Sequence, residues 1–320
     1  MASTGPGVMK AGAARLRGID SRIVGYIFVL LAAALWGSLG IIYNTLNRQY
    51  GVPVGVTVFY RAFFAALGLL VYLGLRKRAL LMLPRRQLPL LLGYALLGIT
   101  VFYSVYGQST ITNTVAVAAV LMYTAPAFVT LFAWRFWGEP LTANKLGALL
   151  LTFVGCALVA QVYAAGQLNF NWLGLVLGLG SGVLYALYTI FANQGLRNGL
   201  APLTVVFYAQ ALGAVGLLTL IVLSSGGLGS VFAAGPHWQA WLLLLTAGLF
   251  NTLAAAGFYV SGLARIETGA ASIASTFELV CASGFGFIFL AQAIDIWQAL
   301  GGVLVIAALV LLARRESRES

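Results

Sequence analysis

Two charged side chains lie inside long apolar stretches of this chain. Glu278 lies about ten residues into the stretch 268 to 290, or roughly 15 Å along a helix. An ionised carboxylate near the centre of a bilayer costs at least ~2.5 kcal/mol. We therefore expect Glu278 to contact a substrate ammonium group or to carry a proton. The alternative is a neutral acid that is hydrogen-bonded to a neighbouring helix.

Arg61, about seven residues into the stretch 54 to 75, is the second such charge. Its guanidinium could bind a substrate carboxylate as a two-pronged fork. With Glu278 on the ammonium group, that pairing would suit a zwitterionic amino acid. Alternatively, the long side chain could snorkel along its own helix to the outer membrane interface. We predict that Arg61 and Glu278 handle charge or protons.

Aromatic side chains with polar tips recur in the same stretches. Those near the ends, such as Tyr43, Tyr106 and Tyr163, are expected in the interfacial belt. Deeper ones need a hydrogen-bond partner, which favours a hydrated cavity over lipid, although helix packing with the tip bonded to a neighbour is the alternative. Together with Glu278, we predict that the deeper residues bind substrate: Trp36, Tyr60, Tyr94, Tyr103, Tyr123, Tyr185 and Tyr208.

Pro126 lies deep in another apolar stretch, where it removes a backbone hydrogen bond. It is expected to kink that helix and could act as a hinge.

The sequence contains no residue pattern that is typical of metal binding, nucleotide hydrolysis or enzyme catalysis. His237 is the single histidine, so neither a metal site nor histidine-based catalysis has a second member. Phosphate-binding lysine loops, zinc spacings and nucleophile elbows do not occur. We expect no enzyme activity, no cofactor, no metal and no ATPase motor in this chain.

The elements that must position these residues are ten apolar stretches, each long enough to cross a bilayer as a helix. Hydrophobic residues make up 61% of the chain and charged ones 8%, far from the composition of soluble proteins. We predict an all-α membrane protein. The expected spans are 23 to 45, 54 to 75, 87 to 108, 114 to 135, 143 to 163, 172 to 194, 202 to 224, 239 to 263, 268 to 290 and 295 to 313.

The net charge of +11 could suggest a nucleic-acid partner, but the basic residues follow a membrane topology. Of the 18 Lys and Arg residues, all but Arg48 and Arg61 fall on the side of the N-terminus when ten spans are drawn. The positive-inside rule then places both termini in the cytoplasm. We expect a lipid bilayer and a small-molecule substrate as partners, and no nucleic acid.

The first five spans resemble the second five at an offset near 150. Trp36 meets Tyr185, and Phe59-Tyr60 meets Phe207-Tyr208. Because each unit has an odd number of crossings, the second copy should be inverted in the membrane around a central cavity, which suits alternating access. The expected organisation is a cytoplasmic tail (1–22), a first repeat (23–165), an inverted second repeat (166–313) and a second cytoplasmic tail (314–320).

Several motifs resemble the drug/metabolite transporter superfamily, in particular its ten-helix branch with two EamA-type repeats. They are Ala34-Leu35-Trp36-Gly37, Tyr123-Thr124-Ala125-Pro126 and the turn Trp137-Gly138-Glu139-Pro140-Leu141. The second half departs from the pattern, with Phe277-Glu278-Leu279 and with Ala291-Gln292-Ala293-Ile294 at the later turn. The chain is also similar to bacterial aromatic amino acid exporters of that superfamily. This resemblance implies an exporter of the inner membrane.

We therefore predict a secondary transporter that exports aromatic or hydrophobic amino acids, either as a uniporter or coupled to protons. An alternative is export of lipophilic cations or drug-like metabolites, through cation-π contacts and ion pairing with Glu278. A non-transporting membrane scaffold or an intramembrane enzyme is the remaining alternative.

Overall fold

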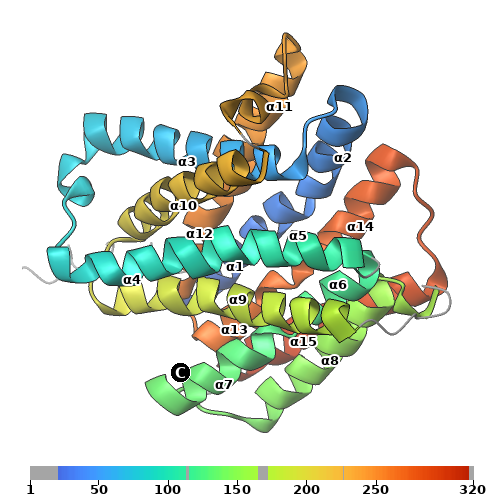
Figure 1. Ribbon diagram of the computed structural model, residues 1–320. Coiled ribbons are helices and arrows are strands. Elements are labelled where there is room, and N and C mark those ends of the chain that lie inside the picture. Colours follow the sequence, from blue (N-terminus) through green and yellow to red (C-terminus); the bar gives the residue numbers. More distant parts are fainter. Residues whose placement is uncertain (1–20, 113–114, 165–171, 226, 317–320) are drawn as a thin grey trace, which may run out of the picture.

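The fold is a bundle of helices, as predicted (Figure 1). A computed structural model describes residues 21–112, 115–164, 172–225 and 227–316. Within these ranges there is no β-strand, and ten helical segments are long and apolar enough to cross a membrane. The all-α fold with ten spans is therefore confirmed. Most of the two predicted tails and the predicted repeat boundary at 165 lie outside the described residues.

The first half contains five of these spans, three of which are interrupted helices. The elements are α1 (Ser21–Gly37) with α2 (Leu39–Tyr50), α3 (Val54–Arg76), α4 (Leu88–Gly93) with the π-helical η3 (Tyr94–Val101) and α5 (Phe102–Thr112), α6 (Val115–Met122) with α7 (Ala125–Trp137), and α8 (Ala143–Val159).

The second half contains the other five spans, two of which are interrupted. The elements are α9 (Trp172–Arg197), α10 (Pro202–Ser225), α11 (Trp238–Gly248) with the π-helical η6 (Leu249–Ala254) and α12 (Ala255–Leu263), α13 (Thr268–Ser275) with α14 (Phe277–Leu290), and α15 (Ile296–Glu316).

The first span is longer than hydropathy predicted. Polar residues such as Asn47 and Arg48 end the apolar stretch, but the helix continues to Tyr50 and stops at Gly51, which has a left-handed φ of 67°. A span of 30 residues is about 45 Å long, more than the ~30 Å hydrocarbon core requires. Residues that seemed to lie at its end are therefore further inside the protein.

The fourth and ninth spans of the chain break at a threonine that bonds back to its own helix. The Thr124 hydroxyl donates to the Leu121 carbonyl over 2.6 Å, and the Thr276 hydroxyl donates to the Ile273 carbonyl over 2.7 Å. The kink predicted at Pro126 is thus a complete break, with Pro126 in the first turn of α7, where its missing N–H costs nothing. Because the break at Thr276 has no proline, the threonine is the shared feature.

The π-helical segments also match between the halves. Thr100 in η3 donates its hydroxyl to the Ala95 carbonyl, and Thr252 in η6 donates its hydroxyl to the Ala247 carbonyl, each five residues back. The interval between these two threonines equals that between the two at the helix breaks. These correspondences support the inverted repeat, which stays a prediction.

Glycines set the closest helix contacts. A Cβ added to Gly301 in α15 would lie 2.6 Å from the Gly155 carbonyl oxygen in α8. One at Gly37 in α1 would lie 2.7 Å from the Glu278 carbonyl oxygen in α14. Such small residues allow two backbones to touch, which is how membrane helices gain packing energy without a hydrophobic driving force. As Figure 1 shows, α15 runs beside α8.

Asp295 ties the start of α15 to the end of α8. The Gln298 N–H donates to Asp295 Oδ1 over 2.9 Å, while the Asp295 N–H donates to Gln298 Oε1 over 3.2 Å. Gln161 and the Tyr163 hydroxyl donate to the other carboxylate oxygen. The Tyr163 hydrogen bond, with that of Gln298, lowers the pKa of Asp295. The reciprocal cap therefore keeps its charge through the neutral pH range.

We expect Gly301→Leu to lower the thermal unfolding midpoint in detergent, because its side chain would force α15 away from α8. Overpacking of this kind costs about 1–3 kcal/mol. Gly40→Leu is the matched control, since a Cβ at Gly40 meets nothing within 4 Å. Equal midpoints for the two variants would contradict this packing.

Candidate functional site

Glu278 is held at the middle of its span by the break at Thr276. It lies in the first turn of α14, in a span that runs from Thr268 to Phe289. Close contact with α1 at Gly37 fixes the backbone at this point. The side chain is half-buried. Part of this carboxyl side chain is therefore left uncovered by its neighbours.

Polar groups from both halves surround this carboxylate. Glu278 interacts electrostatically with Arg61 of α3 and with tyrosines from four other spans: Tyr43, Tyr106, Tyr123 and Tyr185. In the part of the chain that the structure describes, no cation lies within 4.0 Å of it. The acid thus has hydroxyl-bearing neighbours but no direct ion-pair partner.

Arg61 turns into the bundle and does not snorkel to the interface. Its side chain is only 5% exposed. Nε donates to the Thr252 hydroxyl in η6 over 2.9 Å, and Nη1 donates to the Tyr43 hydroxyl over 2.5 Å. The guanidinium also lies 5.7 Å from the ring centre of Tyr43 and 5.6 Å from that of Tyr103. The snorkelling alternative is therefore wrong.

Aromatic rings pack against one another beside these charges. The Trp36 ring lies 5.2 Å from Tyr259 and 6.3 Å from Tyr188. Tyr188 in turn lies 5.1 Å from Tyr94 and 6.0 Å from Tyr185. The rings come from α1, η3, α9 and α12, so both halves contribute. We call the following residues the central cluster: Trp36, Tyr43, Arg61, Tyr94, Phe102, Tyr103, Tyr106, Tyr123, Tyr185, Tyr188, Tyr259 and Glu278.

Two predicted residues lie outside the central cluster. Tyr60 packs against Phe64 and Trp241, at ring distances of 5.5 and 5.1 Å. Tyr208 donates its hydroxyl to the Leu81 carbonyl in the connection after α3, over 2.6 Å. Depth in a span can be counted from sequence, but the direction in which a side chain points cannot. Tyr60 is adjacent to Arg61 and so points to another side of the same helix.

Sequence reasoning left five members out of the predicted site, one of which is Phe102, whose ring lies 5.3 Å from that of Tyr185. Tyr43 and Tyr106 were expected at the interface, but they lie near Arg61 and Glu278. Tyr188 and Tyr259 were not singled out, although Tyr188 follows Tyr185 by three residues and so shares its helix face. That spacing was the available signal. For Tyr259, the Thr189 hydroxyl is a partner at 2.8 Å.

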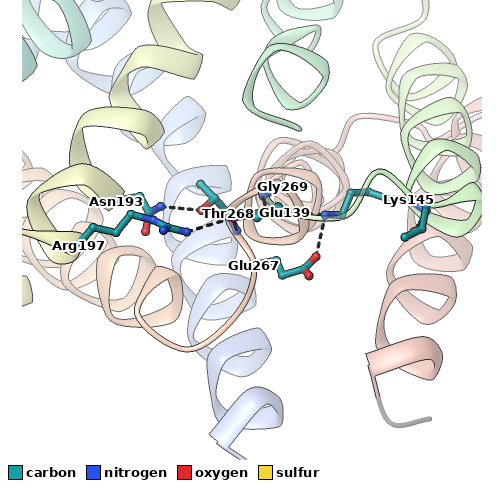
Figure 2. Close-up of polar contacts among 8 residues, drawn as sticks. Glu139, Lys145, Asn193, Arg197, Glu267, Thr268 and Gly269 are labelled. Atoms are coloured by element: carbon teal, nitrogen blue, oxygen red, sulfur yellow. Dashed lines mark hydrogen bonds and ion pairs between the residues drawn. The ribbon is translucent and has the colours of Figure 1, made fainter. Parts of the chain in front are cut away.

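A second group of polar side chains lies where α7, α8, α9 and α13 meet (Figure 2). Glu139, in the turn between α7 and α8, is 8% exposed. The backbone N–H of Thr268 donates to its Oε1 over 2.9 Å, and that of Gly269 donates to its Oε2 over 3.2 Å. The carboxylate thus caps the start of α13, where the helix dipole favours negative charge. The structural role of the glutamate in the Gly138-Glu139-Pro140-Leu141 turn is therefore to cap α13.

Ion pairs extend this group across the halves. Lys145 of α8 is 4% exposed, and its Nζ lies 2.7 Å from Glu267 and 3.7 Å from Glu139. Asn193 and Arg197 of α9 reach the same point. Buried charges require such partners. We call these residues the polar cluster: Glu139, Lys145, Asn193, Arg197, Glu267, Thr268 and Gly269.

A cavity of about 590 Å³ opens beside the polar cluster. Charged residues line much of it, and the lining includes Arg22, Glu139, Asn193, Arg197, Arg265 and Glu267. Among the described residues, no three His, Cys, Asp or Glu side chains gather in one place, so none can be named as metal ligands.

Comparisons with known proteins agree with this architecture. The chain is 28% identical to an uncharacterized transporter of Archaeoglobus fulgidus, over 90% of this chain and 95% of the relative. It is 25% identical to the pseudopaline exporter CntI of Pseudomonas aeruginosa, over 82% and 87% of the two chains. A crystal structure of a protein 18% identical in sequence has the same fold, with a TM-score of 0.76 over 91% of this chain and 98% of that one.

The EamA-like transporter family matches this chain twice, over residues 23–161 and 172–314. Together these matches take in nearly the whole chain, including the central cluster and the polar cluster. The protein is a multi-pass membrane protein that belongs to the EamA-like transporter family.

Proposed function

We propose that this transporter exports amino acids, preferably aromatic or hydrophobic ones, through the space beside the central cluster. One observation carries the proposal: a half-buried carboxylate, Glu278, lies at the middle of its span among groups from both halves, without a cation within 4.0 Å. An acid at this depth costs roughly 2.5 kcal/mol or more. A transporter can use such a group to hold the ammonium of a substrate or to carry a proton.

The neighbouring rings supply the rest of an amino acid site. Tyr103, Tyr106 and Tyr185 are half-buried and offer flat apolar faces, and their polar tips tolerate water. Tyr103 and Tyr106 come from the first half, and Tyr185 comes from the second. A solute held there would contact both halves at once. Transport could then proceed as uniport or with protons carried by Glu278.

A second candidate substrate class is lipophilic cations. The unpaired acid and the aromatic rings of the central cluster would favour them through cation-π contacts. The relative in Pseudomonas aeruginosa is named as an exporter of pseudopaline. Substrates within the family therefore need not be aromatic amino acids.

The polar cluster supports a gate at the predicted cytoplasmic end. It links the turn between α7 and α8 to α9 and α13, and so joins the two halves. Residues at comparable positions of the opposite end, Arg48 and Gln292, are exposed. In the described part of the chain their side chains form no ion pair. An inverted repeat would use these two ends in alternation.

The function is tested by counterflow of labelled phenylalanine in liposomes that contain only this protein, with and without an imposed pH gradient. We expect saturable exchange in the wild type and at least a tenfold loss in Glu278→Gln, because the amide cannot pair with an ammonium group or exchange a proton. Protein-free liposomes give the background. Unchanged exchange in the variant at every pH would remove Glu278 from the mechanism.

The gate is tested with Glu139→Gln, which removes one of the two carboxylates that pair with Lys145 and the charge that pairs with Arg197. We expect the cytoplasmic end to loosen, so that labelling of Cys281 by an impermeant maleimide rises in inside-out vesicles and falls in right-side-out vesicles. Asp295→Asn is the matched control, because it also neutralises a helix-capping carboxylate, but at the opposite end. Identical labelling of Cys281 in the two variants would argue against a gate.

The orientation is tested by Met82→Cys in a background that lacks Cys156 and Cys281. Met82 is 78% exposed and lies in a connection that the charge pattern places in the cytoplasm. Labelling by an impermeant maleimide should require permeabilised cells. Gly229→Cys, in a connection of the opposite side, should label in intact cells, and the reverse pattern would overturn the topology.

A further inference from the structure

We infer that Arg61 is the carboxylate-binding residue of the transport site, so that the substrate must carry a carboxylate and the corresponding amine is rejected. This inference rests on the proposed transport function and narrows its substrate class. It also decides between the two substrate classes above, because a lipophilic cation has nothing to offer Arg61.

The first step is the donor inventory of the guanidinium, which has five N–H groups. One is used on the Thr252 hydroxyl and one on the Tyr43 hydroxyl. Among the described residues, no acceptor takes those that remain on Nη1 and Nη2. These are the groups that form a parallel fork with a carboxylate. An unfilled fork on a side chain that is 5% exposed indicates a missing acceptor.

The second step concerns charge. Arg61 stays ionised in any protein environment, and its two bonded partners are neutral hydroxyls. Its nearest acid in electrostatic terms is Glu278, which forms no ion pair with it within 4.0 Å. Since a buried cation is stable only with an anion or with strong polar compensation, the site is completed by an anionic group of the substrate.

The third step is preorganisation. Thr252 donates its own proton to the Ala247 carbonyl, so its oxygen is free to accept from Arg61 Nε. The rings of Tyr43 and Tyr103 lie within 6 Å of the guanidinium and restrict its plane. Because α2, α3, α5 and η6 together fix this side chain, little rotamer entropy is lost when a carboxylate binds.

The fourth step is the relation between the two charges. Arg61 and Glu278 are close enough to interact but do not pair. A zwitterionic amino acid, which carries a carboxylate and an ammonium group on the same carbon, can offer one group to each of them. An amine without the carboxylate would satisfy Glu278 and leave Arg61 unpaired, which is the usual basis for strong rejection of an analogue.

The experiment compares phenylalanine with phenethylamine, which has the same ring and amine but no carboxylate. Each is used as a competitor of labelled phenylalanine counterflow in liposomes and as a stabiliser of the purified wild-type protein in detergent. We expect phenylalanine to compete and to raise the unfolding midpoint, while phenethylamine does either at least about tenfold less well.

Arg61→Gln should weaken the binding of phenylalanine by about 10- to 100-fold and leave the binding of phenethylamine unchanged. The protein would then no longer discriminate between the two compounds. Thr252→Val is the matched control: it removes the tie between α3 and η6 but keeps the cation. Because the guanidinium keeps its charge and its Nη groups and loses only one tie, discrimination between the two compounds should fall far less than in Arg61→Gln. A loss of discrimination in Thr252→Val as large as that in Arg61→Gln would reduce Arg61 to a positioning residue and overturn the assignment.

The failures of the two proposals are distinguishable. If phenethylamine competes with phenylalanine counterflow and stabilises the wild type as well as phenylalanine does, the carboxylate assignment is wrong and amino acid transport stands. If the wild type neither binds nor carries phenylalanine, the proposed function fails and the inference fails with it. The wild-type comparison decides the matter even if Arg61→Gln does not fold.

Discussion

The cost of placing charge among hydrocarbon decides how this molecule is built. Lys145, Glu139 and Glu267 form a group in which each charge has a partner, and Glu139 also accepts two backbone N–H groups. Arg61 and Glu278 are treated differently, because neither has an ion-pair partner within 4.0 Å among the described residues. Satisfied charges hold the two halves together. Unsatisfied charges at the centre are what a passing solute can satisfy.

Helix breaks make this arrangement possible. The breaks at Thr124 and Thr276 allow a threonine hydroxyl to replace the lost backbone partner, so irregular backbone is tolerated inside the bundle. The break at Thr276 starts a new helix just before Glu278 and sets the direction of its side chain. In η6, the wider π-helical turn leaves the Thr252 hydroxyl both bonded to its own helix and available to Arg61. A threonine that bonds back to its own helix therefore lies beside both Glu278 and Arg61.

Elements of both halves meet in the central cluster and in the polar cluster. Trp36 of α1 contacts Tyr188 and Tyr259, Arg61 of α3 bonds to η6, and Glu139 caps α13. The two matches to the EamA-like transporter family cover one half each, so the contacts join two related units. Under the proposed transport cycle, motion of one unit against the other would have to break the polar cluster.

The sequence by itself determined the all-α fold, the number of spans and the depth of Glu278, because hydrophobic length and the position of charges suffice for each. It also indicated half of the aromatic residues of the central cluster. Only the tertiary structure decided which way they point. Tyr60 and Arg61 are neighbours in the chain, yet Arg61 faces the centre and Tyr60 packs with Trp241. Tyr43 entered the cluster because its span is longer than hydropathy implied. Rotation about a helix axis is set by packing against other helices, which a pattern of apolar residues on all sides cannot encode.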